Sequence, residues 1–289
     1  MKKYPIIDTH THSYFPSMEK DQDVIFKKCE EAGVAVQIQI GCDELSSLAA
    51  LSLAKKHDEF YATLGLHPCD VKNIGKFDPK LHRYPGIDKL KPKAKNFDEL
   101  FEVFSEVFEN NSEKIVGFGE TGFDLYHENS QEILELQKEN FTRHLDLCEK
   151  YNKPVVIHTR NAHKVTLETL EAELPKRNIR GVVHCFCEDT HFAEIVTQKY
   201  GLFLGIGGVL TYNNTEKIRE AVINTPIEYL VTETDSPFLV PRKAKNKKNK
   251  IKHPGLLPEV IELIAELKGM EAEECANILF ENGKRLFEV

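Results

Sequence analysis

Eight short apolar segments, separated by longer amphipathic stretches, constrain the fold of this 289-residue chain more than any other feature. Near-continuous apolar strands are typical of parallel sheets covered on both faces, and the intervening stretches have helical spacing. Eight such units in one chain predict an α/β fold, a (β/α)8 TIM barrel with one extra helix at the C-terminus. The predicted strands are residues 4–8, 34–40, 61–66, 115–120, 154–158, 181–185, 201–206 and 229–233.

The amphipathic stretches predict the helices. A doubly wound open sheet is the alternative fold, but it usually carries a Gly-rich phosphate loop after its first strand, and IIDTHTH at 6–12 offers none. No repeat or linker divides the chain, so residues 1–289 are expected to form a single domain. The predicted helices are 19–32, 43–57, 97–112, 129–152, 161–174, 189–199, 213–224, 256–268 and, last, 271–287.

Apolar runs and cysteine content indicate the cellular compartment in which the protein is expected. No apolar run approaches the roughly 18 residues of a membrane-spanning helix, and the apolar stretch after the two N-terminal lysines is too short for a signal peptide. The seven cysteines are scattered without a CxxC motif, which indicates a reducing compartment. We therefore expect a cytoplasmic protein without a membrane partner, or a nuclear one if the source is eukaryotic. No contiguous apolar surface stripe stands out, so a monomer is expected.

The charge is unevenly distributed. A net charge of −8 argues weakly against non-specific binding to nucleic acid. Residues 242–252, RKAKNKKNKIK, nevertheless hold seven basic side chains and no acid. In a barrel, this run and the Pro-, Gly- and Lys-rich segment 73–96 would be loops at the carboxyl ends of the strands, where active sites are built. The basic run is either a solvated loop or a phosphate grip for single-stranded DNA.

Ionisable residues recur at the ends of the predicted strands. Any one of them could be a hydrogen-bonded structural residue. Several at the same edge of one barrel indicate a metal centre, because buried ionisable groups are costly unless they are paired or bind a metal ion. The residues are His10 and His12 after the first strand, Glu120 after the fourth, His158 after the fifth, His184 after the sixth and Asp235 after the eighth.

The pair His10 and His12 has the spacing of a shared ligand site. Residues i and i+2 of a strand point to the same face, so both imidazoles can reach one cation. Four imidazoles and two carboxylates suit Zn²⁺, Mn²⁺ or Mg²⁺, and nitrogen ligands favour the first two. Six ligands exceed what one tetrahedral ion needs. A two-metal site is therefore expected, with Glu120 as the natural bridge.

The combination of motifs resembles the TatD family of metal-dependent deoxyribonucleases, within the amidohydrolase-like barrels. The resemblance covers nearly the whole chain, and the motifs are specific in combination although HxH alone is common. The motifs are IIDTHTH (6–12), GLHP (65–68), GFGETGFD (117–124), PVVIHTR (154–160), GVVHCF (181–186), GIGGVLT (205–211), ETDSPFL (233–239) and ENGKRLF (281–287).

The resemblance implies an assignment of ligands to two divalent ions. His10, His12, Glu120 and Asp235 would hold the first ion. Glu120 would also hold the second. His158 and His184 complete the implied second set. Glu120 at strand four differs from the carbamylated lysine that other dinuclear amidohydrolases use at that position.

Three departures from the family pattern bear on the substrate. Segment 73–96 is longer than usual, HCFCE replaces the common HCFSG, and a lysine-rich run ending in HPG follows ETDSP. These departures concern substrate preference more than metal binding.

The implied activity is hydrolysis of DNA phosphodiester bonds, exonucleolytic, on single-stranded or frayed DNA. Glu120 and Asp235 are the expected catalytic residues, with Asp235 also orienting or deprotonating the attacking water. Arg160 could clamp a phosphate with two N–H groups, or form a structural ion pair. His67 could contact the phosphate or leaving group, or be structural.

The sequence is also consistent with other roles for several of these residues. Phe123, Tyr126 and Phe238 flank the ligand motifs and could stack on bases, although core packing is expected for at least one of them. The same ring of ligands could hydrolyse a small-molecule ester or amide. A non-catalytic DNA-binding scaffold is the alternative from another class, and the intact ligand set argues against it.

Overall fold

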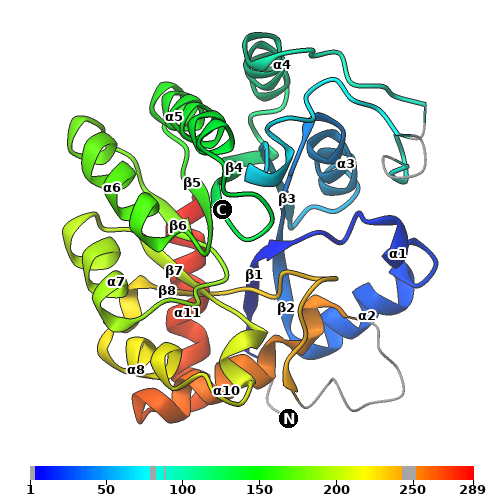
Figure 1. Ribbon diagram of the computed structural model, residues 1–289. Helices are drawn as coiled ribbons and strands as arrows, with labels where there is room; N and C mark the ends of the chain where they lie inside the picture. The colour runs from blue at the N-terminus through cyan, green and yellow to red at the C-terminus, as the bar shows by residue number, and fades with distance from the viewer. Residues whose placement is uncertain (1–3, 79–82, 88, 243–251) are drawn as a thin grey trace. The chain divides into compact units, whose positions relative to one another are not determined.

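A computed structural model describes residues 4–78, 83–87, 89–242 and 252–289 (Figure 1). Most of the basic run, residues 243–251, and five residues of the segment 73–96 lie outside this described part. The strands are β1 (Ile6–Thr11), β2 (Val34–Gln39), β3 (Phe60–Leu64), β4 (Ile115–Asp124), β5 (Val155–Arg160), β6 (Gly181–Val183), β7 (Phe203–Ile206) and β8 (Leu230–Thr232).

Helices separate the strands along the chain, as predicted. Neighbouring strands of the one eight-stranded sheet follow chain order, β1 to β8, and the pairs β3–β4, β4–β5 and β7–β8 are parallel. This pattern is that of the predicted fold class. The helices are α1 (Pro16–Glu19), α2 (Gln22–Ala32), α3 (Glu44–Ala54), α4 (Phe97–Glu109), α5 (Gln131–Tyr151), α6 (His163–Glu173), α7 (Thr190–Glu194), α8 (Glu216–Asn224), α10 (Leu257–Lys268) and α11 (Ala272–Phe287).

Side-chain caps fix where several helices begin. Asp43 accepts from the Ser46 backbone N–H, and the Ser46 hydroxyl accepts from the Asp43 N–H, so α3 starts with a reciprocal capping box. The side chains of Asn96 and Ser130 each accept one backbone N–H, and they cap α4 and α5, respectively. These caps satisfy N–H groups that have no partner within the helix, and they agree with the predicted starts.

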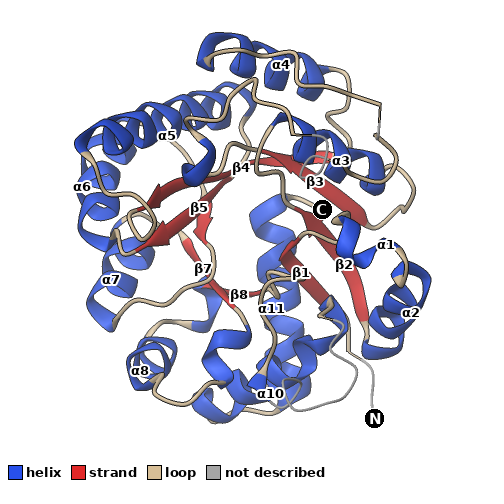
Figure 2. Cartoon of the chain, turned by 45° about the vertical axis from the view of Figure 1, so that its right-hand side comes forward, coloured by secondary structure: helices blue, strands red, loops and turns tan. Residues whose placement is uncertain are grey.

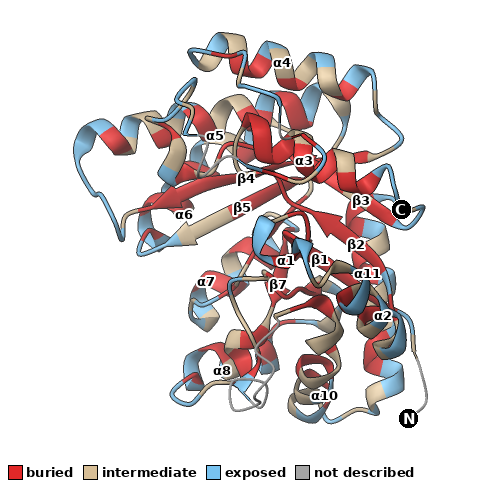
Figure 3. Cartoon of the chain, turned by 90° about the vertical axis from the view of Figure 1, so that its right-hand side faces the viewer, coloured by how far each residue is buried: buried red, intermediate tan, exposed pale blue. Residues whose placement is uncertain are grey.

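Contacts divide the chain into two compact units, Met1–Ile38 with Val183–Val289, and Gln39–Val182. In the second unit, α5 packs on β4 (Figure 2). All ten residues of β4 are buried, whereas β5 changes from buried to exposed toward Arg160 (Figure 3). The core of this unit therefore lies along β4, and the end of β5 reaches solvent.

In the first unit, the C-terminal helix α11 packs on β1 and β8. Gly283 allows this close approach, because a Cβ there would lie 2.5 Å from Ile7 Cγ2. The chain just after β8 runs beside the end of β1: Asp235 N–H donates to His10 O at 2.8 Å, and His12 N–H to Ser236 O at 2.7 Å. The extra C-terminal helix of the prediction is thus present, and it covers the first and last strands.

Strand boundaries differ from prediction at one place that matters for the site. β4 was expected to end at Glu120 but continues to Asp124. Its register with β5 shifts between Phe118 and Thr121, and pairing then resumes up to Asp124 opposite Arg160. Within this irregularity, Glu120 N–H donates to Gly41 O at 2.9 Å. Glu120 therefore projects from the middle of a strand, held at a β-bulge.

Candidate metal centre

In the first unit, His10, His12 and Asp235 converge. Asp235 Oδ1 lies 3.3 Å from His12 Nε2 and 3.8 Å from His10 Nε2. The i, i+2 spacing thus brings both imidazoles to one carboxylate, because alternate residues of a strand point to the same face. One donor atom from each of the three residues lies within 4.8 Å of the others, close enough to share an ion.

Asp235 has an unusual backbone conformation that aims its side chain. Its φ is +53°, a left-handed value that Asp tolerates better than most residues. Its carbonyl accepts the N–H of Phe238 at 2.8 Å. Burial acts to raise the pKa of Asp235, but the hydrogen bond from His12 and the neighbouring imidazoles of His10 and His184 outweigh it. The net pKa is lowered, so the carboxylate is charged and suited to bind a cation.

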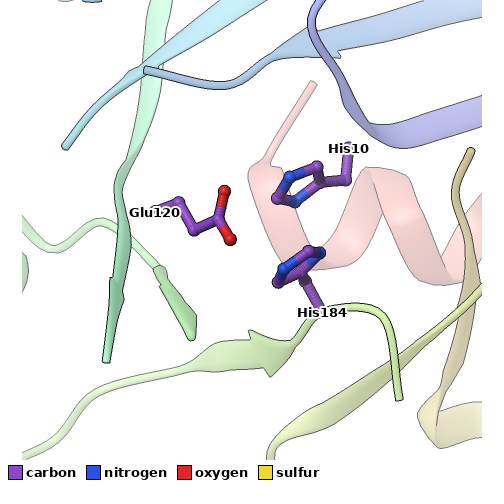
Figure 4. A group of neighbouring side chains, drawn as sticks. All are labelled: His10, Glu120 and His184. Atoms are coloured by element: carbon purple, nitrogen blue, oxygen red, sulfur yellow. The ribbon is translucent and has the colours of Figure 1, made fainter. Parts of the chain in front are cut away.

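His184 joins this group from the end of β6. Its ring stacks on that of His10 with centroids 3.8 Å apart and planes 13° from parallel (Figure 4). Both residues are buried, with 0% of His10 and 4% of His184 exposed. Two positive charges so close would repel in a site shielded from water. The stack therefore disfavours protonation of both rings at the same time, and the neutral imidazole is the form that binds metal ions.

Other buried side chains hold these ligands. The Tyr14 hydroxyl lies 3.3 Å from His12 Nδ1, which leaves Nε2 for Asp235 or a metal ion. Glu233 is 1% exposed; its Oε1 accepts the Cys185 N–H at 2.6 Å and lies 3.5 Å from His184 Nδ1. Partners on the second nitrogen orient a metal-binding histidine. Sequence reasoning missed Glu233, although it stands two residues before Asp235.

In the second unit, Glu120, His158 and His67 form another group. Glu120 Oε1 lies 2.7 Å from His158 Nδ1 and 3.5 Å from His67 Nε2. Figure 4 also labels Glu120, whose side chain projects from β4. The structure thus brings together Glu120 and His158, two predicted ligands, with the predicted substrate residue His67. Cys42 Sγ approaches the other Glu120 oxygen at 3.8 Å.

Hydrogen bonding at His67 indicates its role. Its Nδ1 accepts the Cys69 backbone N–H at 3.1 Å. A neutral ring with Nδ1 as acceptor carries its proton on Nε2, the atom that faces Glu120. His67 is therefore arranged to donate a hydrogen bond rather than to ligate a metal ion.

Asp124 is a second acid that sequence reasoning missed. Its Oδ2 lies 3.2 Å from His158 Nε2, on the opposite side of the ring from Glu120. Burial acts to raise the pKa of Asp124, but the hydrogen bond with His158 and the Tyr126 N–H outweigh it, so the pKa is lowered far below its ordinary value. Asp124 is thus a charged partner for His158.

Arg160 lies at the exposed end of β5. Its guanidinium carbon is 3.8 Å from the centre of the Tyr126 ring, and Nη1 is 3.4 Å from His127 Nε2. No ion pair of Arg160 with a carboxylate is present among the described residues, so the structural ion pair considered from sequence has no support there. The contact with Tyr126 orients the planar guanidinium at this end of the strand.

The donors present fit divalent cations. His158 lies between two carboxylates, and both contacts are hydrogen bonds only when both ring nitrogens carry protons. If a divalent ion replaced the proton on either ring nitrogen, the carboxylate facing that nitrogen would be placed to bind the ion. In the first unit, two imidazoles face one charged carboxylate, a mixed nitrogen and oxygen set that suits Zn²⁺ or Mn²⁺.

Comparison with known proteins decides the family. A family model described as TatD related DNase matches residues 7–288. The chain belongs to the TatD family. It is 30% identical over 286 residues to the metal-dependent hydrolase YabD of Bacillus subtilis, covering 98% of this chain and 99% of YabD. It is 29% identical over 287 residues to the metal-dependent hydrolase YcfH of Escherichia coli K12, covering 98% of this chain and 96% of YcfH.

A solved structure of a TatD homologue has the same fold as this TatD-family chain. The crystal structure of YjjV, a TatD homologue from Escherichia coli K12, is similar with a TM-score of 0.81 and 28% identity, covering 98% of both chains. This likeness confirms the predicted (β/α)8 fold class. The family places the chain among metal-dependent hydrolases. No helix within the described ranges is long and apolar enough to cross a membrane.

Proposed function

We propose that this TatD-family protein is a deoxyribonuclease that hydrolyses phosphodiester bonds at the ends of single-stranded or frayed DNA. The observation that carries the proposal is that each compact unit supplies its own set of imidazole and carboxylate donors from residues within or just after its strands. In (β/α)8 enzymes these ends form a single active face. We infer one centre with two divalent ions, in which Glu120 serves both.

The proposed ligand sets follow the family motifs. His10, His12, Glu120 and Asp235 would hold one ion, and Glu120, His158 and His184 the other. When bound, such ions supply hydroxide near neutral pH and neutralise charge on a phosphoryl group. Mg²⁺, Mn²⁺ and Zn²⁺ are the candidate ions.

The remaining chemistry belongs to the chain itself. Asp235 has a lowered pKa, so its carboxylate can accept a hydrogen bond from the attacking water and fix its direction. His67 is arranged to donate from Nε2, which suits the leaving oxygen or a phosphate oxygen. Arg160, held against Tyr126, would clamp a neighbouring phosphate with two N–H groups.

Several features support DNA as the substrate. The matching family model is described as TatD related DNase. Arg160 presents a planar cation at the solvent-exposed end of β5. The sequence after Asp235 carries the seven basic side chains of residues 242–252. A phosphate backbone matches such a distribution of positive charge better than a neutral ester or amide does.

The test is cleavage of a single-stranded oligonucleotide labelled at both ends, with each metal ion supplied in turn. The Glu120→Gln variant removes the charge proposed to bridge the ions, and Glu113→Gln, an exposed glutamate before β4, is the matched control. Metal-dependent cleavage by wild type and Glu113→Gln, absent in Glu120→Gln, supports the proposal. A metal-loaded wild type that cleaves carboxylic esters or amides but not DNA overturns it.

A further inference from the structure

Phe238 is an exposed aromatic residue at the edge of the first unit's ligand group. Among the described residues, five large hydrophobic side chains are exposed, and Phe238 is one of two aromatic ones, with 49% of its surface accessible. It stands three residues after Asp235 in ETDSPFL. Phe123, by contrast, is fully buried against Phe141, so core packing explains that residue.

Two aromatic rings fix Phe238 in place. Its ring centre lies 5.3 Å from that of Phe15 and 5.4 Å from that of His12, both in edge-to-face arrangements. The Phe238 backbone N–H donates to Asp235 O at 2.8 Å. The ring is therefore a rigid apolar surface, half open to solvent, that touches a proposed metal ligand directly.

A positive charge lies beside this ring. Lys252 Nζ donates to the Phe238 carbonyl at 2.7 Å. An ammonium group has three N–H donors, and this bond uses one of them. Aromatic rings combined with basic side chains are typical of surfaces that bind single-stranded nucleic acid, where bases stack and phosphates meet cations.

We propose that Phe238, supported by Phe15, is the platform on which a nucleobase next to the scissile phosphate stacks, while Lys252 contacts that nucleotide's phosphate. The inference rests on the proposed nuclease function and names the part of the substrate that the site holds. Every base has a π-face, so the platform accepts all four bases. A base inside a duplex is already stacked and unavailable, so the platform selects single-stranded or frayed ends.

The chain offers a matched control for surface exposure. Ile223 is also 49% exposed, and its carbonyl accepts Lys268 Nζ at 2.9 Å, just as Phe238 O accepts Lys252 Nζ. Ile223 lies on α8 and belongs to no proposed ligand or substrate contact. Replacing Ile223 by Ala removes a comparable exposed apolar surface without touching the proposed platform.

The experiment combines protein variants with a modified substrate. Wild type, Phe238→Ala, Phe238→Leu, Phe238→Tyr and Ile223→Ala are loaded with the same metal ion. Each is assayed on a single-stranded oligonucleotide and on a set in which one nucleotide flanking the scissile bond lacks its base. Stacking of a base on an aromatic ring strengthens substrate binding, so we expect roughly 10-fold lower kcat/KM for Phe238→Ala, mainly through KM.

The substrate series identifies the contact. At one position, removal of the base should slow the wild type by the same factor, and Phe238→Ala should show no further loss, because both changes remove one interaction. Phe238→Leu keeps an apolar side chain but no aromatic face, so it should behave like Phe238→Ala, whereas Phe238→Tyr and Ile223→Ala should retain full activity.

Two results overturn the inference in distinguishable ways. One result is that the losses in kcat/KM from Phe238→Ala and from base removal multiply at every position, or that Phe238→Leu is fully active. In either case Phe238 does not stack on a base, but the nuclease proposal stands. If metal-loaded wild type cleaves none of the oligonucleotides, the proposed nuclease function fails and the platform fails with it.

Discussion

The Glu233 carboxylate joins the backbone after β6 to the ring of His184: its Oε1 accepts the Cys185 N–H at 2.6 Å and lies 3.5 Å from His184 Nδ1. Cys185 has a φ of +47°, so the chain turns sharply just after the histidine. Gly205 leaves room for the acid, because a Cβ there would lie 2.1 Å from Glu233 Oε2. These features fix the direction in which His184 presents its other nitrogen.

Glu233→Gln should therefore weaken metal binding without unfolding the protein. The amide oxygen can still accept the Cys185 N–H, but the negative charge beside His184 is lost. Loss of such a carboxylate partner typically reduces metal affinity 10–100-fold. Metal titration by calorimetry measures this, with Glu216→Gln, an exposed glutamate on α8, as control. Equal metal affinity in wild type and Glu233→Gln would show that Glu233 does not position His184.

His144 should make stability depend on pH. It is fully buried; its Nε2 accepts the Leu66 N–H at 3.3 Å and its Nδ1 lies 2.8 Å from Asn140 O. Burial lowers its pKa from 6.5 to about 4, with the Asn140 carbonyl opposing the shift. Between these values the unfolded chain binds a proton that the native state excludes. The free energy of unfolding therefore falls as pH drops from about 6.5 to 4, by about 3 kcal/mol from this group.

His144→Gln removes this titration while keeping a polar side chain. Urea unfolding at pH values from 7 to 4 should give a shallower loss of stability for the variant than for wild type, whatever its stability at pH 7. Parallel pH profiles for the two proteins would mean that His144 does not titrate in this window.

Glu44 should anchor the long segment after β3. Its two carboxylate oxygens accept the N–H groups of Lys93 and Ala94 at 2.8 and 3.0 Å, and the residue is 5% exposed. Glu44→Ala leaves both N–H groups without this acceptor, which should cost about 2–3 kcal/mol. Urea unfolding and limited proteolysis within residues 73–96 check the prediction, with the exposed Glu59→Ala as control. Unchanged proteolysis in Glu44→Ala would refute the anchoring role.

Gly283→Ala should destabilise the protein although it lies inside a helix. In an exposed helix this substitution gains up to about 1 kcal/mol. Here the new Cβ would lie 2.5 Å from Ile7 Cγ2 and 3.3 Å from Thr9 Cγ2, so overpacking should cost about 1–3 kcal/mol. Thermal or urea unfolding measures the sign. In the double variant with Ile7→Ala the two losses should not add, whereas simple additivity would place the strain elsewhere.

The fold could be predicted from sequence because strands and helices have distinct periods. Each predicted strand overlaps an observed one, and the caps of Asp43, Asn96 and Ser130 mark helix starts that the pattern alone indicates. Strand ends were less predictable. β4 continues past Glu120 because pairing with β5 resumes after a bulge, and such a local shift in register leaves no periodic signal.

The candidate ligands were predictable for a similar reason, whereas the residues that support them were not. The i, i+2 rule identified His10 and His12 as neighbours. The rule does not reach Glu233, because Glu233 and Asp235 both lie beyond the end of β8 and Asp235 has a left-handed φ. Asp124 lies at an even spacing from Glu120, but that relation becomes visible only when β4 is known to continue. The single domain, the cytoplasmic location, the monomeric state and the DNA partner stay predictions.

The central claim is that Glu120 serves two metal ions in one centre that cleaves DNA. It is tested most directly by measuring bound metal per chain and single-stranded DNA cleavage on the same samples of wild type and Glu120→Gln. We predict two equivalents of metal and cleavage for the wild type, and fewer than two equivalents with a loss of activity of roughly 100-fold or more for Glu120→Gln. A Glu120→Gln protein with the full metal complement and wild-type cleavage would contradict the account.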